Sequence, residues 1–136
     1  DADAAYGFYE EALKLSPGEV LVLNNYAYFL AEDDRDLKKA LKMAEEVMRI
    51  EGNNPTYIDT YAWVLYKLGK HRSAWKEMKR IVDANAADDP EILEHIGYIL
   101  YELGRCTEAV AYWKQSLEQD STKTYLEEEI RKCGTE

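Results

Sequence analysis

The sequence predicts an all-α fold, a solenoid of antiparallel helix–turn–helix repeats. Similar stretches recur at Tyr26, Tyr61 and Ile96, 35 residues apart, and repetition at a period of about 20 to 50 residues is typical of stacked-repeat proteins. Apolar residues follow helical spacing, and no long alternating run of Val, Ile and Thr indicates a sheet. With 46% apolar and 12% aromatic residues, the 136-residue chain can form the core of one domain.

Each copy begins with a predicted amphipathic helix. Its apolar residues lie at positions i, i+3, i+4 and i+7, which is one face of a helix. The three sets are Leu23, Tyr26, Ala27 and Leu30; Ile58, Tyr61, Ala62 and Leu65; and Leu93, Ile96, Gly97 and Leu100. Because the third member is always Ala or Gly, we expect another helix to approach closely at that point.

A second helix follows a turn in each copy. The turns are at Asp34-Arg35, Gly69-Lys70 and Gly104-Arg105, and glycine favours the left-handed conformation that ends a helix. The second helices are anchored by Ala40 and Ala44, by Ala74 and Met78, and by Ala109 and Trp113.

These units resemble the tetratricopeptide-repeat family, in which helix–turn–helix units of about 34 residues carry small and aromatic anchors. The third copy matches best. In the second copy, Ala62 replaces the glycine and Met78 replaces the aromatic residue that the family has at these positions. The first copy departs furthest, with Asp34 for the turn glycine and Ala44 for the aromatic residue. The amino-acid sequence is similar to that of the C-terminal repeats of bacterial members of this family. The resemblance implies a right-handed α-solenoid over residues 1–136.

The predicted repeats span residues 19–54, 55–89 and 90–121. At the N-terminus, Ala5, Tyr9 and Pro17 have the family's spacing, so we expect residues 2–17 to be the second helix of a repeat whose first helix lies upstream. Residues 122–134 carry the apolar stripe Leu126, Ile130 and Cys133, with acidic residues early and basic residues late, as the helix dipole favours. We expect them to form the capping helix that solenoids need at an end.

The resemblance implies that the first helices line a concave face on which a partner binds. The expected groove residues are Asn24, Tyr28, Asp59, Trp63, Tyr66, Glu94, Tyr98 and Tyr101. Aromatic residues anchor interfaces, so this row suits a peptide with apolar and basic residues. Alternatively, the aromatic rings pack between adjacent first helices. We favour packing for Tyr66 and Tyr101, and both alternatives stay open for the other three rings.

The charge excludes some partners. There are 17 basic and 27 acidic residues, a formal net charge of −10, which disfavours nucleic acid and anionic membranes as partners.

No apolar run approaches the roughly 18 residues that span a bilayer. The lysines, asparagines and arginine with which one subgroup of the family binds a C-terminal carboxylate are absent from the corresponding positions.

The sequence predicts no catalytic, metal or cofactor site. His71 and Cys106 lie in equivalent turns, which stacked helices place about 10 Å apart, whereas a nucleophile and its base need about 3 Å. His95 has Ile99, not a second ligand, four residues on. The cluster Glu32, Asp33, Asp34 and Asp36 lacks the glycine and terminal glutamate of a calcium loop.

Two cysteines, Cys106 and Cys133, are too few for a disulfide framework. We expect free thiols, although the sequence does not decide against one bridge.

The predicted function is a non-catalytic protein–protein interaction module, a scaffold or adaptor that binds a peptide or partner segment. The alternative is a structural part of a longer solenoid, or a homodimerisation module that uses Tyr6, Phe8, Tyr9 and Leu13. The compartment stays open between the cytoplasm and the bacterial cell envelope, with any targeting segment expected upstream.

Overall fold

A computed structural model describes residues 2–134, and over this range the chain is helical with no strand. The helices are α1 (Ala2–Leu15), α2 (Val20–Glu32), α3 (Leu37–Glu51), α4 (Pro55–Lys67), α5 (His71–Asp83), α6 (Pro90–Glu102), α7 (Cys106–Gln119) and α8 (Tyr125–Gly134). The prediction of an all-α fold is therefore confirmed. No helix in the described range is both long and apolar enough to cross a membrane.

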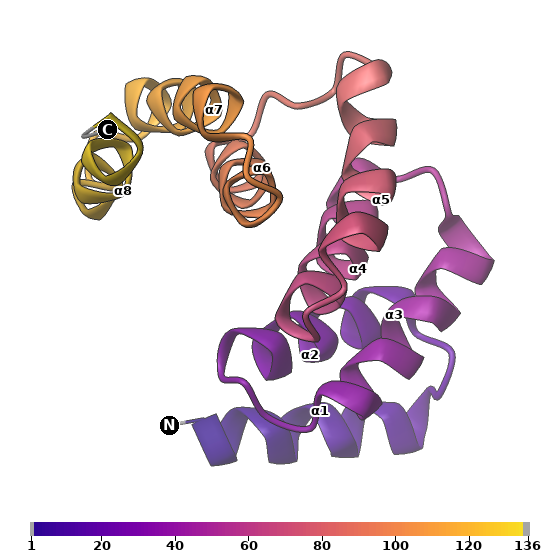
Figure 1. The fold of residues 1–136 in the computed structure, drawn as a ribbon. Coiled ribbons are helices and arrows are strands. Elements are labelled where there is room, and N and C mark those ends of the chain that lie inside the picture. Colours follow the sequence, from indigo (N-terminus) through magenta and orange to yellow (C-terminus); the bar gives the residue numbers. More distant parts are fainter. Residues whose placement is uncertain (1, 135–136) are drawn as a thin grey trace. The chain divides into compact units, whose positions relative to one another are not determined.

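The chain divides into two compact units, with the boundary between Gly69 and Lys70. The first contains α1 to α4 and the second α5 to α8 (Figure 1). Within the first unit, α2 packs on α1, α3 and α4. Within the second, α6 packs on α5 and α7, and α7 packs on α8.

Two helices begin at a proline that follows a capping side chain. Asn54 Oδ1 accepts hydrogen bonds from the backbone N–H groups of Thr56 and Tyr57, at 2.9 and 3.4 Å, and α4 starts at Pro55. Asp89 caps α6 in the same way, before Pro90. Proline suits the first helical position because the N–H that it lacks has no partner within the helix.

The turns between paired helices use left-handed backbone. Gly69 and Gly104 have φ of 80° and 77°. In the first copy, where the glycine is absent, Asp34 and Asp36 take this role with φ of 53° and 45°. Aspartate tolerates this region better than most residues, although glycine adopts it more readily. The first copy therefore keeps the turn despite its altered sequence.

The predicted apolar stripes form the cores of the two units. On α2, Leu23, Tyr26, Ala27 and Leu30 are all buried, and so are Leu93, Ile96, Gly97 and Leu100 on α6. On α4, Ile58, Ala62 and Leu65 are buried while Tyr61 is half-buried. The second-helix anchors Ala40, Ala44, Ala74, Met78, Ala109 and Trp113 are buried as well.

Helices α6 and α7 cross closely at Gly97. A Cβ atom added to Gly97 would lie 2.2 Å from Trp113 Nε1 and 2.3 Å from Trp113 Cδ1. The indole ring therefore occupies the space that any other residue would need. Trp113 Nε1 also donates a hydrogen bond to the backbone oxygen of Glu94 at 3.2 Å, which fixes the ring across the two helices.

Tyrosine hydroxyl groups hold α1 on the rest of the first unit. Tyr6 is buried and donates to Asp33 and to the backbone oxygen of Phe29. Tyr26 donates to Glu10 at 2.5 Å, and Lys39 pairs with the same carboxylate.

The opposite side of α1 is apolar and exposed. Phe8 and Leu15 have exposed fractions of 73% and 89%. Of the four residues expected at a dimer contact, Phe8 is the exposed one. Tyr6 is covered by the chain itself, and Tyr9 and Leu13 are half-buried.

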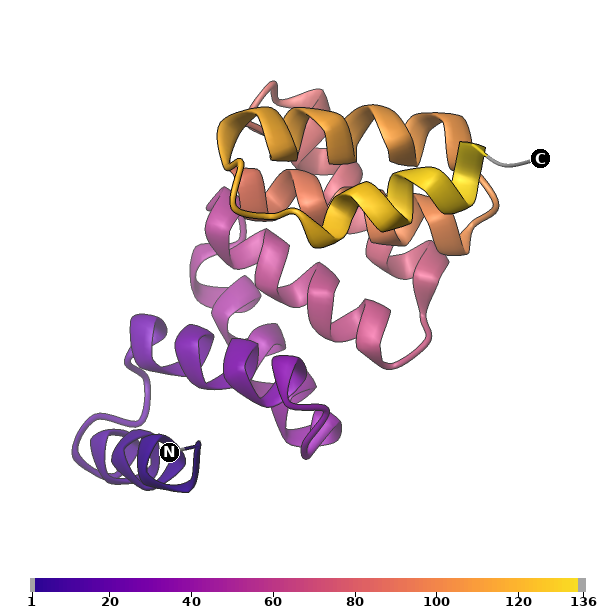
Figure 2. The same cartoon turned by 90° about the vertical axis from the view of Figure 1, so that its left-hand side faces the viewer.

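Helix α8 lies beside α7, as Figure 2 shows. Leu126 is fully buried, and Glu94 of α6 accepts hydrogen bonds from Lys123 Nζ and the Tyr125 hydroxyl at the start of α8. The helix begins at Tyr125, so the residues from 122 to 124 lead into it from α7.

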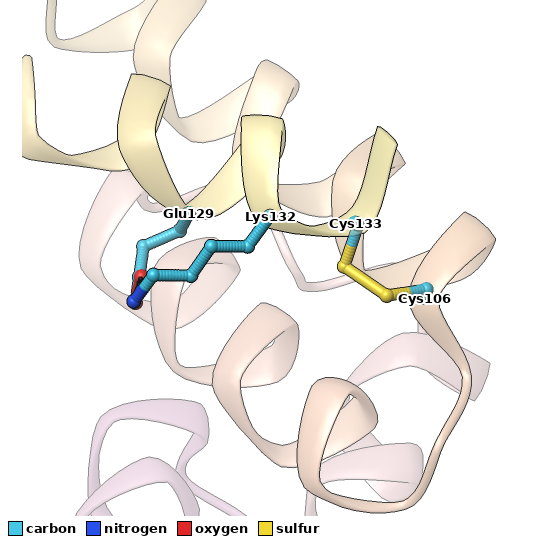
Figure 3. Close-up of a disulfide and its surroundings, with 4 residues drawn as sticks. All are labelled: Cys106, Glu129, Lys132 and Cys133. Carbon is cyan, nitrogen blue, oxygen red and sulfur yellow. Dashed lines mark hydrogen bonds and ion pairs between the residues drawn. A yellow bond between two sulfur atoms is a disulfide. The ribbon is translucent and has the colours of Figure 1, made fainter. Parts of the chain in front are cut away.

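The expectation of free thiols is wrong, because Cys106 and Cys133 form a disulfide with a Cα–Cα distance of 5.5 Å. The bond joins the first residue of α7 to the last turn of α8 (Figure 3). The cysteines are 27 residues apart in the sequence, and a loop of this length corresponds to about 3 to 4 kcal/mol of stabilisation in the chain-entropy description.

We predict that Gly97→Ala and Gly7→Ala have opposite effects on stability. Gly97→Ala forces a methyl group into Trp113 and should lower the free energy of unfolding by about 1 to 3 kcal/mol. At Gly7, within α1, a Cβ meets nothing within 4 Å, so alanine should stabilise the helix by up to about 1 kcal/mol. Urea unfolding followed by circular dichroism measures both. Equal effects of the two substitutions would show that Gly97 does not determine how closely α6 and α7 approach each other.

We also predict that alkaline pH weakens the docking of α1. Burial and the hydrogen bond to Asp33 raise the pKa of Tyr6 from 10.0 to about 12. Because the pKa is higher in the folded state, the contribution of Tyr6 is complete below pH 10 and is lost as the pH rises to about 12. The loss amounts to about 2 to 3 kcal/mol.

Chemical unfolding of the wild type and Tyr6→Phe at alkaline pH, from about one unit below the ordinary tyrosine pKa upward, tests this prediction. The variant should be less stable at the start of this range but should lose less stability as the pH rises. Tyr57→Phe is the control, because the Tyr57 hydroxyl makes no side-chain hydrogen bond within residues 2–134. If Tyr6→Phe retains the full alkaline loss, the loss arises elsewhere.

Candidate partner-binding residues

Trp63, from the middle of the predicted aromatic row, is held by its own unit. Its ring is buried and stacks on Tyr66, with ring centroids 4.6 Å apart and an interplanar angle of 7°. Its Nε1 donates to Glu32 Oε1 at 2.9 Å. Lys67 Nζ lies 5.7 Å from the ring centroid. These contacts favour packing for Trp63 and Tyr66.

Tyr28 lies nearer to the surface of α2 and is half-buried. It meets Phe29 edge to face, with ring centroids 5.5 Å apart and an interplanar angle of 74°. Phe29 has an exposed fraction of 45%, so the two rings form an accessible aromatic pair. Edge-to-face pairs orient both rings, and this arrangement suits an apolar contact with a partner.

Asn24 and Asp59 are buried polar residues on α2 and α4, with exposed fractions of 5% and 6%. Asn24 Oδ1 has no hydrogen-bond partner in the described part of the chain. A buried amide without a partner costs about 1 to 3 kcal/mol. The position of Asn24 is therefore not explained by the hydrogen bonding of the folded chain.

Glu94 on α6 is already paired. Its Oε1 lies 2.9 Å from Lys123 Nζ and 2.8 Å from the Tyr125 hydroxyl, and the side chains of Glu94 and Lys123 are both largely covered. Burial by itself lowers the pKa of Lys123, but the hydrogen bond and the charge of Glu94 outweigh it and raise the pKa above its usual value. Lys123 is thus a firmly charged partner that neutralises Glu94.

Tyr98 and Tyr101 both contact the indole of Trp113. Tyr98 meets it edge to face at 5.4 Å, and Tyr101 lies tilted at 5.9 Å. Tyr98 is half-buried, and Tyr101 has an exposed fraction of 38%. The two rings are therefore supported from beneath while part of each remains accessible.

Sequence reasoning did not find the residues that hold these side chains. Glu32, which binds Trp63, belongs to the acidic cluster for which the sequence raises only the question of a calcium loop, and the sequence predicts no role for Lys123 and Tyr125. Lys123 is 29 residues from Glu94, so no helical periodicity links them. No signal in the sequence could have paired them.

The acidic cluster beside α2 is engaged within the chain. Glu32 accepts from Trp63, Asp33 from Tyr6, and Asp34 lies 3.7 Å from Lys67. Each of these three carboxylates therefore has a partner on another element or turn of the first unit. Cys106 has no thiol in this structure, and His95 is buried on α6.

Residues 33–116, more than half of the chain, match the protein family described as "Anaphase-promoting complex, cyclosome, subunit 3". The chain belongs to this family. Solved structures of tetratricopeptide-repeat (TPR) proteins share its fold. One is TTC0263 from Thermus thermophilus, with a TM-score of 0.73 and 20% identity over 97% of this chain and 72% of that one.

A second TPR structure is YrrB, described as having an unusual peptide-binding site. It has a TM-score of 0.63 and 24% identity, over 98% of this chain and 73% of that one. The uncharacterised protein ycf37 of Pyropia yezoensis is 42% identical over 52 residues, 38% of this chain. The match spans 29% of ycf37. At these identities the structures confirm the TPR fold and do not assign a ligand.

We predict that Asn24→Leu leaves the TPR fold intact. The substitution removes a buried amide whose oxygen accepts no hydrogen bond from residues 2–134, so the melting temperature should stay the same or rise. Ser116→Ala is the matched control. The buried Ser116 hydroxyl donates to the backbone oxygen of Pro90 at 2.6 Å, and its loss should cost about 1 to 2 kcal/mol. Differential scanning calorimetry compares the two, and an equal loss would assign Asn24 a role in folding.

Proposed function

We propose that this TPR protein is a non-catalytic interaction module that binds a peptide or partner segment on the face formed by its first helices. The observation that carries the proposal is the accessible pair of aromatic rings on α2, Tyr28 and Phe29, which meet edge to face at 5.5 Å while Phe29 is 45% exposed. Apolar side chains of a partner would pack on these rings. The peptide-binding site named for the structural neighbour YrrB supports the same class of function.

The contacts divide the expected binding residues into two groups. Trp63 and Tyr66 stack on each other, and their role in the proposal is to support the surface. Tyr28, Tyr98 and Tyr101 keep accessible area and are the proposed contacts for apolar side chains. Asn24 and Asp59 are buried beneath this surface, and their role in the proposal is likewise to support it.

The preference for basic residues in the partner rests on acidic groups, and Glu94 is neutralised by Lys123. A basic partner side chain that reached Glu94 would therefore have to displace Lys123. Asp59 is the remaining acidic residue of the proposed set, and it is buried. We accordingly propose that apolar contacts dominate recognition and that charge selects among partners only weakly.

The experiment is a peptide-array screen with the 136-residue chain, followed by titration of the best ligand. The double variant Tyr28→Ala, Tyr98→Ala should raise Kd by about tenfold or more, because aromatic anchors carry a large part of interface energy. Tyr112→Ala is the matched control. Tyr112 is also half-buried but lies on the second helix α7, so its loss should leave Kd nearly unchanged.

Equal losses in both variants would contradict a site on the first helices. Circular dichroism of each variant confirms that the helices are retained.

The second candidate is self-association through α1. The exposed Phe8 and Leu15, seven residues apart on one side of that helix, support it. Sedimentation velocity of the same samples separates the two candidates, because a dimer through α1 should dissociate in Phe8→Glu while ligand binding at Tyr28 is unaffected.

We also propose an oxidising compartment, such as the bacterial cell envelope, for this chain. The Cys106–Cys133 disulfide supports it, because reducing compartments keep most thiols free.

A further inference from the structure

The Cys106–Cys133 disulfide lies beside an open surface depression of about 390 Å³. Its lining consists of Gly104, Arg105, Cys106, Thr107, Glu108 and Cys133. A Cβ atom added at Gly104 or at Gly134 would meet nothing within 4 Å. There is therefore open space at the backbone two residues before Cys106 and one residue after Cys133, and both cysteines are only partly buried. A reactant thiol can approach the bond without opening the core.

The two sulfur atoms have different surroundings. Cys106 is the first residue of α7, where the unpaired N–H groups and the positive end of the helix dipole stabilise a thiolate. Cys133 lies in the last turn of α8, where the negative end of the helix dipole disfavours a thiolate.

Nearby side chains change this difference little. Arg105 is bound to Glu108 by two hydrogen bonds of 2.7 and 2.8 Å, so its charge is largely compensated. Beside Cys133, Lys132 is paired with Glu129 at 2.8 Å, as Figure 3 shows. Arg131 is paired with Glu128. The helix ends are therefore the main source of the asymmetry.

We propose that this bond is a thiol–disulfide exchange site for a dithiol reductant protein, which attacks Sγ of Cys133. A new S–S bond forms between the reductant and Cys133, while the Cys106–Cys133 bond breaks. The electron pair leaves with Cys106 as a thiolate, the better leaving group because the helix N-terminus stabilises its negative charge.

The second thiol of the reductant then attacks its own sulfur in the mixed disulfide. This step releases Cys133 as a thiolate, which takes a proton from water. The chain ends with two reduced cysteines, and the reductant ends with one disulfide, so two electrons pass from the reductant to the chain.

Reduction would free one end of α8 and leave the other attached. At the first turn, Leu126 is fully buried and Glu94 binds both Lys123 and Tyr125. At the last turn, the disulfide is the covalent tie to α7. A helix of 10 residues is marginal without tertiary contacts, so its last turn should fray once the bond is cut.

The test uses the oxidised 136-residue chain and a reduced thioredoxin-type protein whose second cysteine is replaced by serine. This reductant can attack but cannot resolve the mixed disulfide. Peptide mapping by mass spectrometry should find the mixed disulfide on Cys133 about tenfold more often than on Cys106. The single variants Cys106→Ser and Cys133→Ser have no internal disulfide and should trap nothing.

Hydrogen exchange provides the second measurement. After reduction with dithiothreitol, amides of residues 130–134 should exchange about tenfold faster, while those next to Leu126 keep their protection. The double variant Cys106→Ser, Cys133→Ser should give the same pattern as the reduced chain.

Three results would overturn the proposal. A mixed disulfide mainly on Cys106 would contradict the assignment of the leaving group. Trapping that requires denaturant would show a purely structural bond. Unchanged exchange at residues 130–134 would show that the bond does not restrain the end of α8.

Discussion

The close approach of paired helices at a small residue is the constraint on which the rest of each unit depends. At Gly97 the absence of a side chain gives Trp113 its place, and the indole then contacts Tyr98 and Tyr101. The small residue therefore positions not only the core but also the aromatic surface above it. In the first copy, Ala27 of α2 and Ala44 of α3 are both buried, and α2 packs on α3.

The two ends of the described chain are attached by different chemistry. Helix α1 depends on tyrosine hydroxyls and carboxylates, with a stacked Tyr9–Tyr26 pair at 5.3 Å. Helix α8 depends on one buried leucine, a three-residue polar cluster and a disulfide. Within the described residues, α1 packs on α2 and α8 packs on α7. Polar contacts in both cases, and a covalent bond in the second, add to this packing.

The sequence predicted the helices and their buried faces because these follow from local periodicity. Ala27, Ala62 and Gly97 lie at corresponding points of three copies, and all are buried. The missed features all join residues far apart in the chain. Trp63 and Glu32 are 31 residues apart, and the two cysteines 27. The candidate site was predicted less completely for the same reason, because spacing gave no information on which distant side chains already bind Trp63 and Glu94.

The cluster of Glu94, Lys123 and Tyr125 links the cap to the chemistry of the repeats. Glu94 belongs to a first helix, whereas the cation that neutralises it belongs to the segment leading into α8. A different terminal segment, without the lysine, would leave an uncompensated carboxylate on the same helix. Under the proposed function, exchanging the segment that leads into α8 would therefore change which partners the first helices prefer, although this segment lies outside the repeats.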